Sequence, residues 1–199
     1  EFPLWITQLS WNTFLVFLGL TCTVSSTFIL NQIFDVKSDH ANEKLFLIGE
    51  HFTPEKARSI ARIMLISGLL ISFLANWVTA ILTAGIYLLW GIAYNQKPFE
   101  WKKKPIAGWL ANILVGVLLF IIGWMLGMSD TTNAGIMSLS LDTLFYMLPY
   151  LLSFSAVALL STLLERKDDD VETSTSPIVI GFSASLIISL FMVCSALYL

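Results

Sequence analysis

Three oxygen-bearing side chains recur at a four-residue spacing where the first apolar run of the chain ends. They are Asn31, Asp35 and Asp39. If the helix expected for that run continues through them, all three share one face, because residues four apart are neighbours on a helix. Two carboxylates and an amide oxygen are hard ligands suited to Mg²⁺. Carboxylates near a helix C-terminus oppose the helix dipole, so we expect a cation to compensate them.

A second acidic cluster, at residues 165–172, follows another apolar run. Glu165 and Asp169 share one helical face. The consecutive aspartates of this cluster repel one another unless cations lie near. Asp168, Asp169 and Glu172 spell D-D-x-x-E, a spacing suited to holding Mg²⁺ on a diphosphate. If the two clusters face each other across a helical bundle, they can hold two or more Mg²⁺ ions that bridge one diphosphate.

Fixed positive charge for the same anion is available at residues 97–104, which hold four lysines beside Tyr94. We predict that this anion is bound by three basic residues: Lys102, Lys103 and Arg166. An alternative for these lysines is a topology signal and lipid anchor, because lysine runs commonly follow membrane helices.

Composition places the chain in the membrane class. Its 199 residues are 56% hydrophobic and only 13% charged, and the mean hydropathy is +0.78. A soluble domain usually carries about a quarter charged residues. We therefore expect membrane lipid as a partner and no nucleic acid. No basic segment or small-residue cleavage site precedes the first apolar run, so we expect no signal peptide, and we expect the chain to be part of a longer protein.

The elements that position these residues are six apolar runs, each long enough to cross a hydrocarbon core of about 30 Å as a helix. Lipid offers no partners for exposed backbone amides, so helices are the expected form. The second and third runs are separated only by Asn76 and Trp77, which predicts a tight turn. Thr53, Pro54 and Glu55 form a helix-start signal. We predict one all-α polytopic transmembrane bundle over residues 1–199, with helices at 10–33, 60–76, 78–95, 106–127, 143–164 and 178–199.

The charges give the bundle an orientation. All 11 Lys and Arg fall at residues 37–62, 97–104 and 166–167, which are the connections after the first, third and fifth helices. The positive-inside rule places that side in the cytoplasm or its topological equivalent. The same side also holds both acidic clusters. The positive-inside rule explains the placement of Lys and Arg but not the placement of acidic residues. A face rich in both signs of charge is what a site for a metal-bound anion needs.

These residues resemble the motifs of the UbiA superfamily of intramembrane prenyltransferases. Asn31, Asp35 and Asp39 match its first motif, N-x-x-x-D-x-x-x-D, in full. Its second motif is usually D-x-x-x-D, which reads Glu165-x-x-x-Asp169 here, so a glutamate stands where an aspartate is expected. Residues 94–105 are similar to the family's Y-x-x-x-P-x-x-x-K linker.

The resemblance implies a nine-helix fold, of which this chain would supply the second to seventh helices. It implies Mg²⁺-dependent transfer of an isoprenyl group from a prenyl diphosphate to an aromatic or lipid acceptor, as in quinone or lipid biosynthesis. The metal would be held by both acidic motifs, and an acceptor would attack the allylic cation. Four aromatic residues are candidates to stabilise that cation by a cation–π contact, and the choice among them stays open: Phe34, Tyr94, Tyr146 and Tyr150. The Asn31-Gln32 pair slightly favours a homogentisate or chlorophyll-type acceptor.

Two other classes of protein remain as alternatives. The first is a polytopic transporter whose acids form a cation site, although transporter charges tend to lie at mid-membrane in broken helices. The acids here cluster at one end, which favours the enzyme. The second is a CDP-alcohol phosphotransferase, whose D-x-x-D-G-x-x-A-R signature is absent from the sequence.

Overall fold

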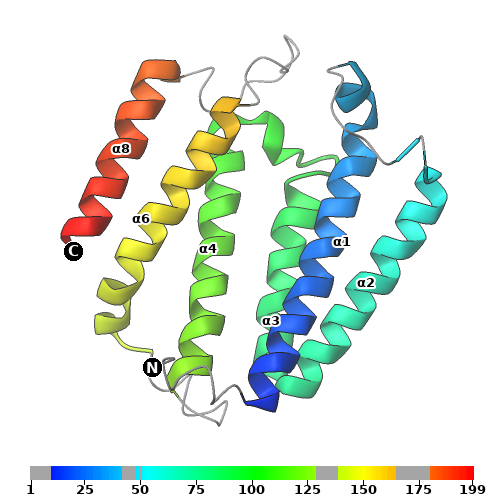
Figure 1. The fold of residues 1–199 in the computed structure, drawn as a ribbon, viewed down its shortest axis with the longest axis horizontal. Helices are drawn as coiled ribbons and strands as arrows, with labels where there is room; N and C mark the ends of the chain where they lie inside the picture. Colours follow the sequence, from blue (N-terminus) through cyan, green and yellow to red (C-terminus); the bar gives the residue numbers. More distant parts are fainter. Residues whose placement is uncertain (1–9, 42–47, 50, 129–138, 165–179) are drawn as a thin grey trace, which may run out of the picture.

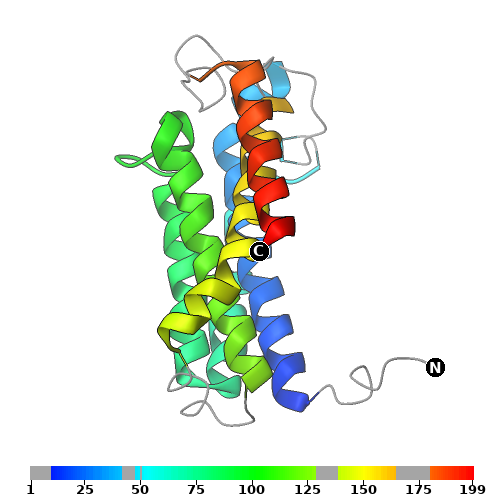
Figure 2. The same ribbon diagram turned by 90° about the vertical axis from the view of Figure 1, so that its left-hand side faces the viewer.

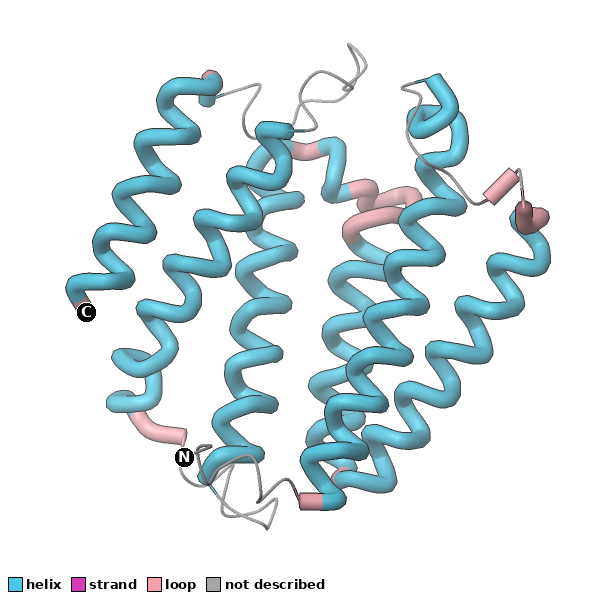
Figure 3. Tube along the Cα trace, in the orientation of Figure 1, coloured by secondary structure: helices cyan, strands magenta, loops and turns pink. Residues whose placement is uncertain are grey.

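The computed structural model describes residues 10–41, 48–49, 51–128, 139–164 and 180–199. Within these residues every regular secondary-structure element is a helix (Figures 1 and 3), and Ile48 and Phe52 form only an isolated β-bridge. The all-α bundle is therefore confirmed. Its elements are α1 (Trp11–Ala41), α2 (Pro54–Ala75), α3 (Trp77–Ile86) with its π-helical continuation η2 (Tyr87–Ala93), the 3₁₀ turn η3 (Trp101–Lys103), α4 (Pro105–Met128), α6 (Leu141–Leu164) and α8 (Phe182–Tyr198).

The helices have the length and surface of membrane spans. Four of those described are long and apolar enough to cross a bilayer, including Pro54–Ala75 with 22 residues. At 1.5 Å per residue, such a helix is about 33 Å long. Large apolar side chains on α2 and α8 are exposed, which suits contact with lipid rather than water. The chain is a multi-pass membrane protein. These exposed side chains include Ile63, Ile66, Leu70 and Phe73 on α2, and Ile187, Leu190 and Phe191 on α8.

Two helices extend beyond the apolar runs that predicted them. α1 continues past residue 33 to Ala41, so its polar last turns are helical as well. α2 begins at Pro54 rather than at residue 60. There the Thr53 hydroxyl accepts the backbone N–H of Lys56 at 3.4 Å. The capping signal therefore sets the start of α2, while hydropathy marks only the part that lies in lipid.

A tight turn joins α2 to α3, as predicted. The Asn76 side chain accepts the backbone N–H of Thr79 at 2.7 Å and so caps α3. The third helix then widens into the π-helical segment η2, where the Tyr94 N–H donates to the Leu89 carbonyl at 2.8 Å. Gly91 leaves room for the Tyr87 ring in this segment, because an added Cβ would lie 2.9 Å from the ring and the ring would have to move.

The α1–α2 interface is built on small residues. A Cβ added at Gly68 of α2 would lie 2.8 Å from the Gly19 carbonyl oxygen and 2.8 Å from the Thr23 nitrogen, both on α1. Ser72, one helical turn after Gly68, is fully buried in α2. Gly19-x-x-x-Thr23 and Gly68-x-x-x-Ser72 therefore form a small-xxx-small crossing, in which backbones approach closely.

The interior joins α1, α3 and α4. Val16 of α1, Ile86 of α3, and Val115 and Ile122 of α4 form one buried cluster. α6 packs on the far side of α4, where the Trp109 indole N–H donates to the Ser155 carbonyl at 3.2 Å. α8 in turn packs against α6. The helices therefore succeed one another across the molecule in the order α2, α1, α3, α4, α6, α8 (Figure 1).

The helices run along one common direction, so the bundle has two distinct ends (Figures 1 and 2). The last turns of α1, the start of α2, the connection from η2 to α4 and the end of α6 all lie at one end, the upper end in Figure 1. Among the described residues, this end carries the charged segments 37–41, 51–62 and 97–104. For these segments, the single-sided charge pattern of the sequence therefore corresponds to one end of the bundle.

Candidate functional site

An ion pair at the charged end joins the first acidic motif to the lysine-rich connection. The Lys102 ammonium donates to Oδ1 of Asp35. The Lys102 side chain is 15% exposed and that of Asp35 is 24% exposed, so the pair is largely screened from solvent. The residues are 67 positions apart in the sequence. The fold thus brings together two segments that were predicted to serve one site.

Lys102 is positioned by its backbone. It lies in the 3₁₀ turn η3, and its N–H donates to the Tyr94 carbonyl at 3.2 Å. The first turn of α4 approaches η3 closely, because a Cβ added at Gly108 would lie 3.0 Å from the Trp101 carbonyl oxygen. Lys102 therefore presents its ammonium from a turn that is held on both sides.

Polar side chains also fix the start of this connection. Asn95 donates through Nδ2 to the Trp90 carbonyl at 2.7 Å, and Gln96 donates through Nε2 to the Gly91 carbonyl at 3.1 Å. Both bonds satisfy carbonyls that the end of a helix leaves unpaired. The Trp90 indole N–H donates to Oδ1 of Asn112 at 2.9 Å, which ties η2 to α4. These bonds attach the connection between η2 and α4 to both helices, so the backbone that carries Lys102 is held in place.

Lys103 has a different partner from Lys102. Its ammonium lies 3.1 Å from Oε1 of Glu100, within the same turn. Glu100 has a φ of 40°, in the left-handed region that favours glycine. The hydrogen bond from Lys103 lowers the pKa of Glu100, and the charges of Lys103, Lys97 and Lys102 lower it further. Glu100 thus holds Lys103 within the turn, while Lys102 reaches across to α1.

The predicted ligands of the first motif lie along one continuous helix. Asn31 and Asp35 are partly buried residues of α1, and Asp39 belongs to its last turns. The helical continuation on which their common face depends is confirmed. The Asp39 side chain lies outside the described part of the chain, and no group of three or more His, Cys, Asp or Glu forms a metal site among the described residues. Metal binding by these residues stays a prediction.

The second motif lies outside the described residues. This applies to all four of its predicted site residues, Glu165, Arg166, Asp168 and Asp169. The element before it is described, however. α6 ends at Leu164, at the same end of the bundle as the last turns of α1 (Figure 1). The cluster therefore follows a helix that ends on the side where Asp35 and Lys102 meet.

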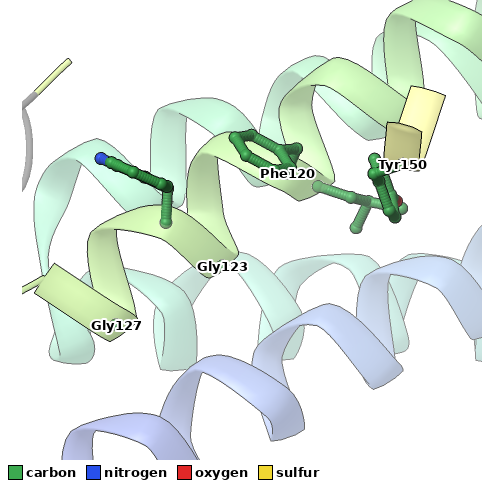
Figure 4. A pocket seen from close by; sticks show the side chains of 6 residues that line it. Phe120, Gly123, Gly127 and Tyr150 are labelled. Carbon is green, nitrogen blue, oxygen red and sulfur yellow. The ribbon is translucent and has the colours of Figure 1, made fainter. Parts of the chain in front are cut away.

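An apolar pocket of about 490 Å³ lies between α4 and α6, away from the ion pair. Figure 4 shows Phe120 and Tyr150 at one end of this pocket and Gly127 at the other. A Cβ added at Gly123 or Gly127 meets nothing within 4 Å, so both glycines leave open space beside the helix. Gly127 lies next to the last residue of α4, which places the pocket in the half of the bundle opposite Lys102. The lining residues are Leu119, Phe120, Gly123, Trp124, Gly127 and Tyr150.

A continuous series of aromatic rings runs past this pocket, and three of them, Phe120, Trp124 and Tyr150, line it. Neighbouring ring centroids in the series are 5.7 to 5.9 Å apart, within the usual range for interacting rings. The rings come from both α4 and α6 and so follow the seam of the two helices. The series runs Phe154, Tyr150, Phe120, Trp124, Tyr146.

Sequence reasoning singled out Tyr146 and Tyr150 but missed the pocket that Tyr150 lines. The sequence feature that could have indicated the pocket is the pair Gly123 and Gly127, which lie four residues apart on one helix face beside Phe120. The ion pair between Asp35 and Lys102 was also missed, because no local pattern links the two residues.

The comparisons with known proteins gave one match. The model of the UbiA prenyltransferase family matches residues 3–199, which is almost the entire chain. The search of curated proteins gave no match. The search of solved structures gave none either.

Proposed function

The chain belongs to the UbiA prenyltransferase family, and from that premise we propose that it transfers an isoprenyl group from a prenyl diphosphate to a hydrophobic acceptor within the membrane. The observation that carries the proposal is the pairing of Asp35 with Lys102 at one end of an apolar bundle. A substrate with an anionic head and a hydrocarbon tail needs charged groups of both signs next to a membrane interior, and this end of the bundle offers them.

The donor set suits Mg²⁺. Asn31, Asp35 and Asp39 lie at four-residue intervals on α1 and offer hard oxygen ligands. Asp35 already takes a cationic partner, as expected for a carboxylate in the C-terminal part of a helix. We propose that these residues hold the metal together with Glu165, Asp168 and Asp169. When bound there, Mg²⁺ would supply positive charge to the diphosphate.

The basic residues act on the leaving group. Transfer breaks the bond between C1 of the prenyl chain and the bridging oxygen, and the electron pair leaves with the diphosphate. Lys102, Lys103 and Arg166 would stabilise the charge that gathers on that oxygen, because fixed cations in a site screened from water act strongly on developing charge. The acceptor then forms the new bond to C1 and releases a proton.

The apolar bundle receives the prenyl tail. The aromatic series on α4 and α6 lies in the half of the bundle away from the ion pair, where the far end of a long tail would reach. Tyr146 and Tyr150 belong to that series and so lie far from the reacting carbon. Phe34 directly precedes Asp35, and the Tyr94 carbonyl binds the Lys102 N–H. Phe34 and Tyr94 are therefore the candidates for cation–π stabilisation of the allylic cation.

We further propose that the charged end faces the cytoplasm or its topological equivalent. The support is the charge distribution of the sequence, since all 11 Lys and Arg fall in the connections after the first, third and fifth apolar runs. The acceptor is an aromatic ring or a lipid. A homogentisate or chlorophyll-type acceptor is the first to try.

The test is Mg²⁺-dependent release of diphosphate from a labelled prenyl diphosphate, with a panel of acceptors. We expect Asp35→Ala and Asp169→Ala each to lower the rate about 100-fold or more, because each removes a ligand of the metal that holds the leaving group. Asp142→Ala is the matched control, because Asp142 lies in the first turn of α6, at the opposite end of the bundle. Undiminished turnover in both test variants would refute the mechanism.

A further inference from the structure

Asp35 has two competing cationic partners. It is a proposed metal ligand, yet its Oδ1 accepts the ammonium of Lys102. A lysine ammonium is a compact cation that donates but cannot accept, so a divalent cation bound by the same carboxylate repels it. Metal binding at Asp35 therefore weakens the bond from Lys102.

We propose that Lys102 exchanges partners during substrate binding, from Asp35 in the free protein to a diphosphate oxygen in the loaded site. This inference rests on the proposed function and concerns the order in which its ligands bind. Lys102 acts as a substitute cation in the free protein, which keeps a largely screened carboxylate paired. It becomes an anion ligand when the metal takes Asp35.

The structure permits the exchange without a change of fold. The Lys102 backbone is fixed by its bond to the Tyr94 carbonyl and by the close approach of Gly108 to η3. The ammonium lies at the end of a flexible four-carbon stem, so rotation of the side chain alone can redirect it. The anchored turn keeps the new position of the ammonium within reach of the old one.

The exchange links the binding of metal to the binding of diphosphate. A divalent cation that binds alone and displaces Lys102 leaves its ammonium partly buried without a partner, which is unfavourable. Diphosphate offers that ammonium a new partner. The cation and the anion should therefore each raise the affinity for the other, and by the same factor.

Neighbouring lysines do not share this position. Lys103 is held by Glu100 within the turn, and Lys104 is exposed. Lys104→Met is therefore the matched control for Lys102→Met. Both variants remove one positive charge from the same connection, and both keep an unbranched apolar side chain.

The first test measures binding rather than turnover. Mn²⁺, which takes the same oxygen ligands as Mg²⁺, is titrated into the protein without diphosphate and followed by electron paramagnetic resonance. We expect Lys102→Met to bind Mn²⁺ about tenfold more tightly than the wild type, because the competing charge-assisted bond is gone. In excess Mg²⁺, we expect the same variant to bind inorganic pyrophosphate about tenfold more weakly, because one ionic contact is lost. Lys104→Met should change neither affinity by more than about twofold.

The second test needs no variant, so it stands even if Lys102→Met fails to fold. Amine acetylation of the wild-type protein is followed at single lysines by mass spectrometry. Labelling of Lys102 should rise when Mg²⁺ is added alone, and it should fall again when pyrophosphate is added with Mg²⁺. Labelling of Lys104 should stay constant throughout.

The outcomes separate the two proposals. Opposite changes in Mn²⁺ and pyrophosphate affinity, with the matching labelling pattern, support the exchange. Unchanged or weaker Mn²⁺ binding by Lys102→Met, or constant labelling of Lys102, overturns it while leaving the proposed function intact. A wild-type protein that binds neither Mn²⁺ nor pyrophosphate overturns the proposed function and the exchange together.

Discussion

Replacing Gly68 with alanine should separate α1 from α2 and lower the stability of the bundle. The added Cβ would lie 2.8 Å from the Gly19 carbonyl oxygen and 2.8 Å from the Thr23 nitrogen. Both are backbone atoms, so no side-chain rotation can relieve the contact. Because α1 carries Asp35, the same displacement should also disturb the site at its end.

The magnitude follows from the geometry. The contact is about 0.6 Å shorter than an ordinary one of 3.4 Å, so the two backbones must move apart by roughly that amount. Overpacking of this kind costs about 1–3 kcal/mol, and the better helix propensity of alanine offsets up to about 1 kcal/mol. Gly123→Ala is the matched control, because its Cβ meets nothing within 4 Å and it gains the propensity alone.

The assay is thermal unfolding of the purified protein in detergent, followed by the loss of its monodisperse peak in size-exclusion chromatography. One kcal/mol corresponds to about 2–4 °C for a chain of this length. We expect Gly68→Ala to unfold several degrees below the wild type, and Gly123→Ala at or slightly above it. Equal midpoints for the two variants would refute the close packing of α1 on α2.

Three further predictions concern the pocket, a helix cap and the lysine-rich turn. Gly123→Phe should fill the pocket and shift the preference of the enzyme towards donors with shorter prenyl chains. The measurement is kcat/KM for donors of increasing chain length, and an unchanged preference would mean that the prenyl tail does not occupy the pocket. Asn76→Ala should lose the cap of α3 and cost about 1 kcal/mol in thermal stability; Asn76→Asp, which keeps an accepting oxygen, should retain most of it. Glu100 has a lowered pKa, so its contribution to stability is fully present above the usual carboxyl pKa of 4.5 and is lost as pH falls through the lower folded value. The protection of amides around residue 102 from hydrogen exchange, taken relative to their intrinsic rates at each pH, should fall only in that acidic window, and Glu100→Gln should abolish the pH step.

The fold was largely predictable because lipid imposes a simple rule. Each apolar run long enough to span the membrane must satisfy its backbone bonds internally, so each predicted run corresponds to a helix. Helix ends were less predictable, because they depend on polar residues outside the span. α1 continues through Asp35, and α2 starts at the Thr53 cap rather than at its first apolar residues.

Contacts between helices were the part that local patterns could not supply. The candidates Asp35 and Lys102 were each visible from composition and spacing. Their pairing joins residues 67 positions apart and depends on how η2 and η3 turn the chain back. The close crossing at Gly19 and Gly68 was not predicted, because small residues on one helix do not indicate which helix they pack against.

The most direct test of the central claim is a double-mutant cycle on pyrophosphate binding in excess Mg²⁺, with Asp35→Asn, Asp169→Asn and both together. If the two acidic motifs hold one metal-bound diphosphate jointly, the losses should be non-additive by at least about 1 kcal/mol, because the first substitution already dismantles the shared site. Losses that add to within about 0.5 kcal/mol would mean that the motifs act independently, and they would contradict a shared site.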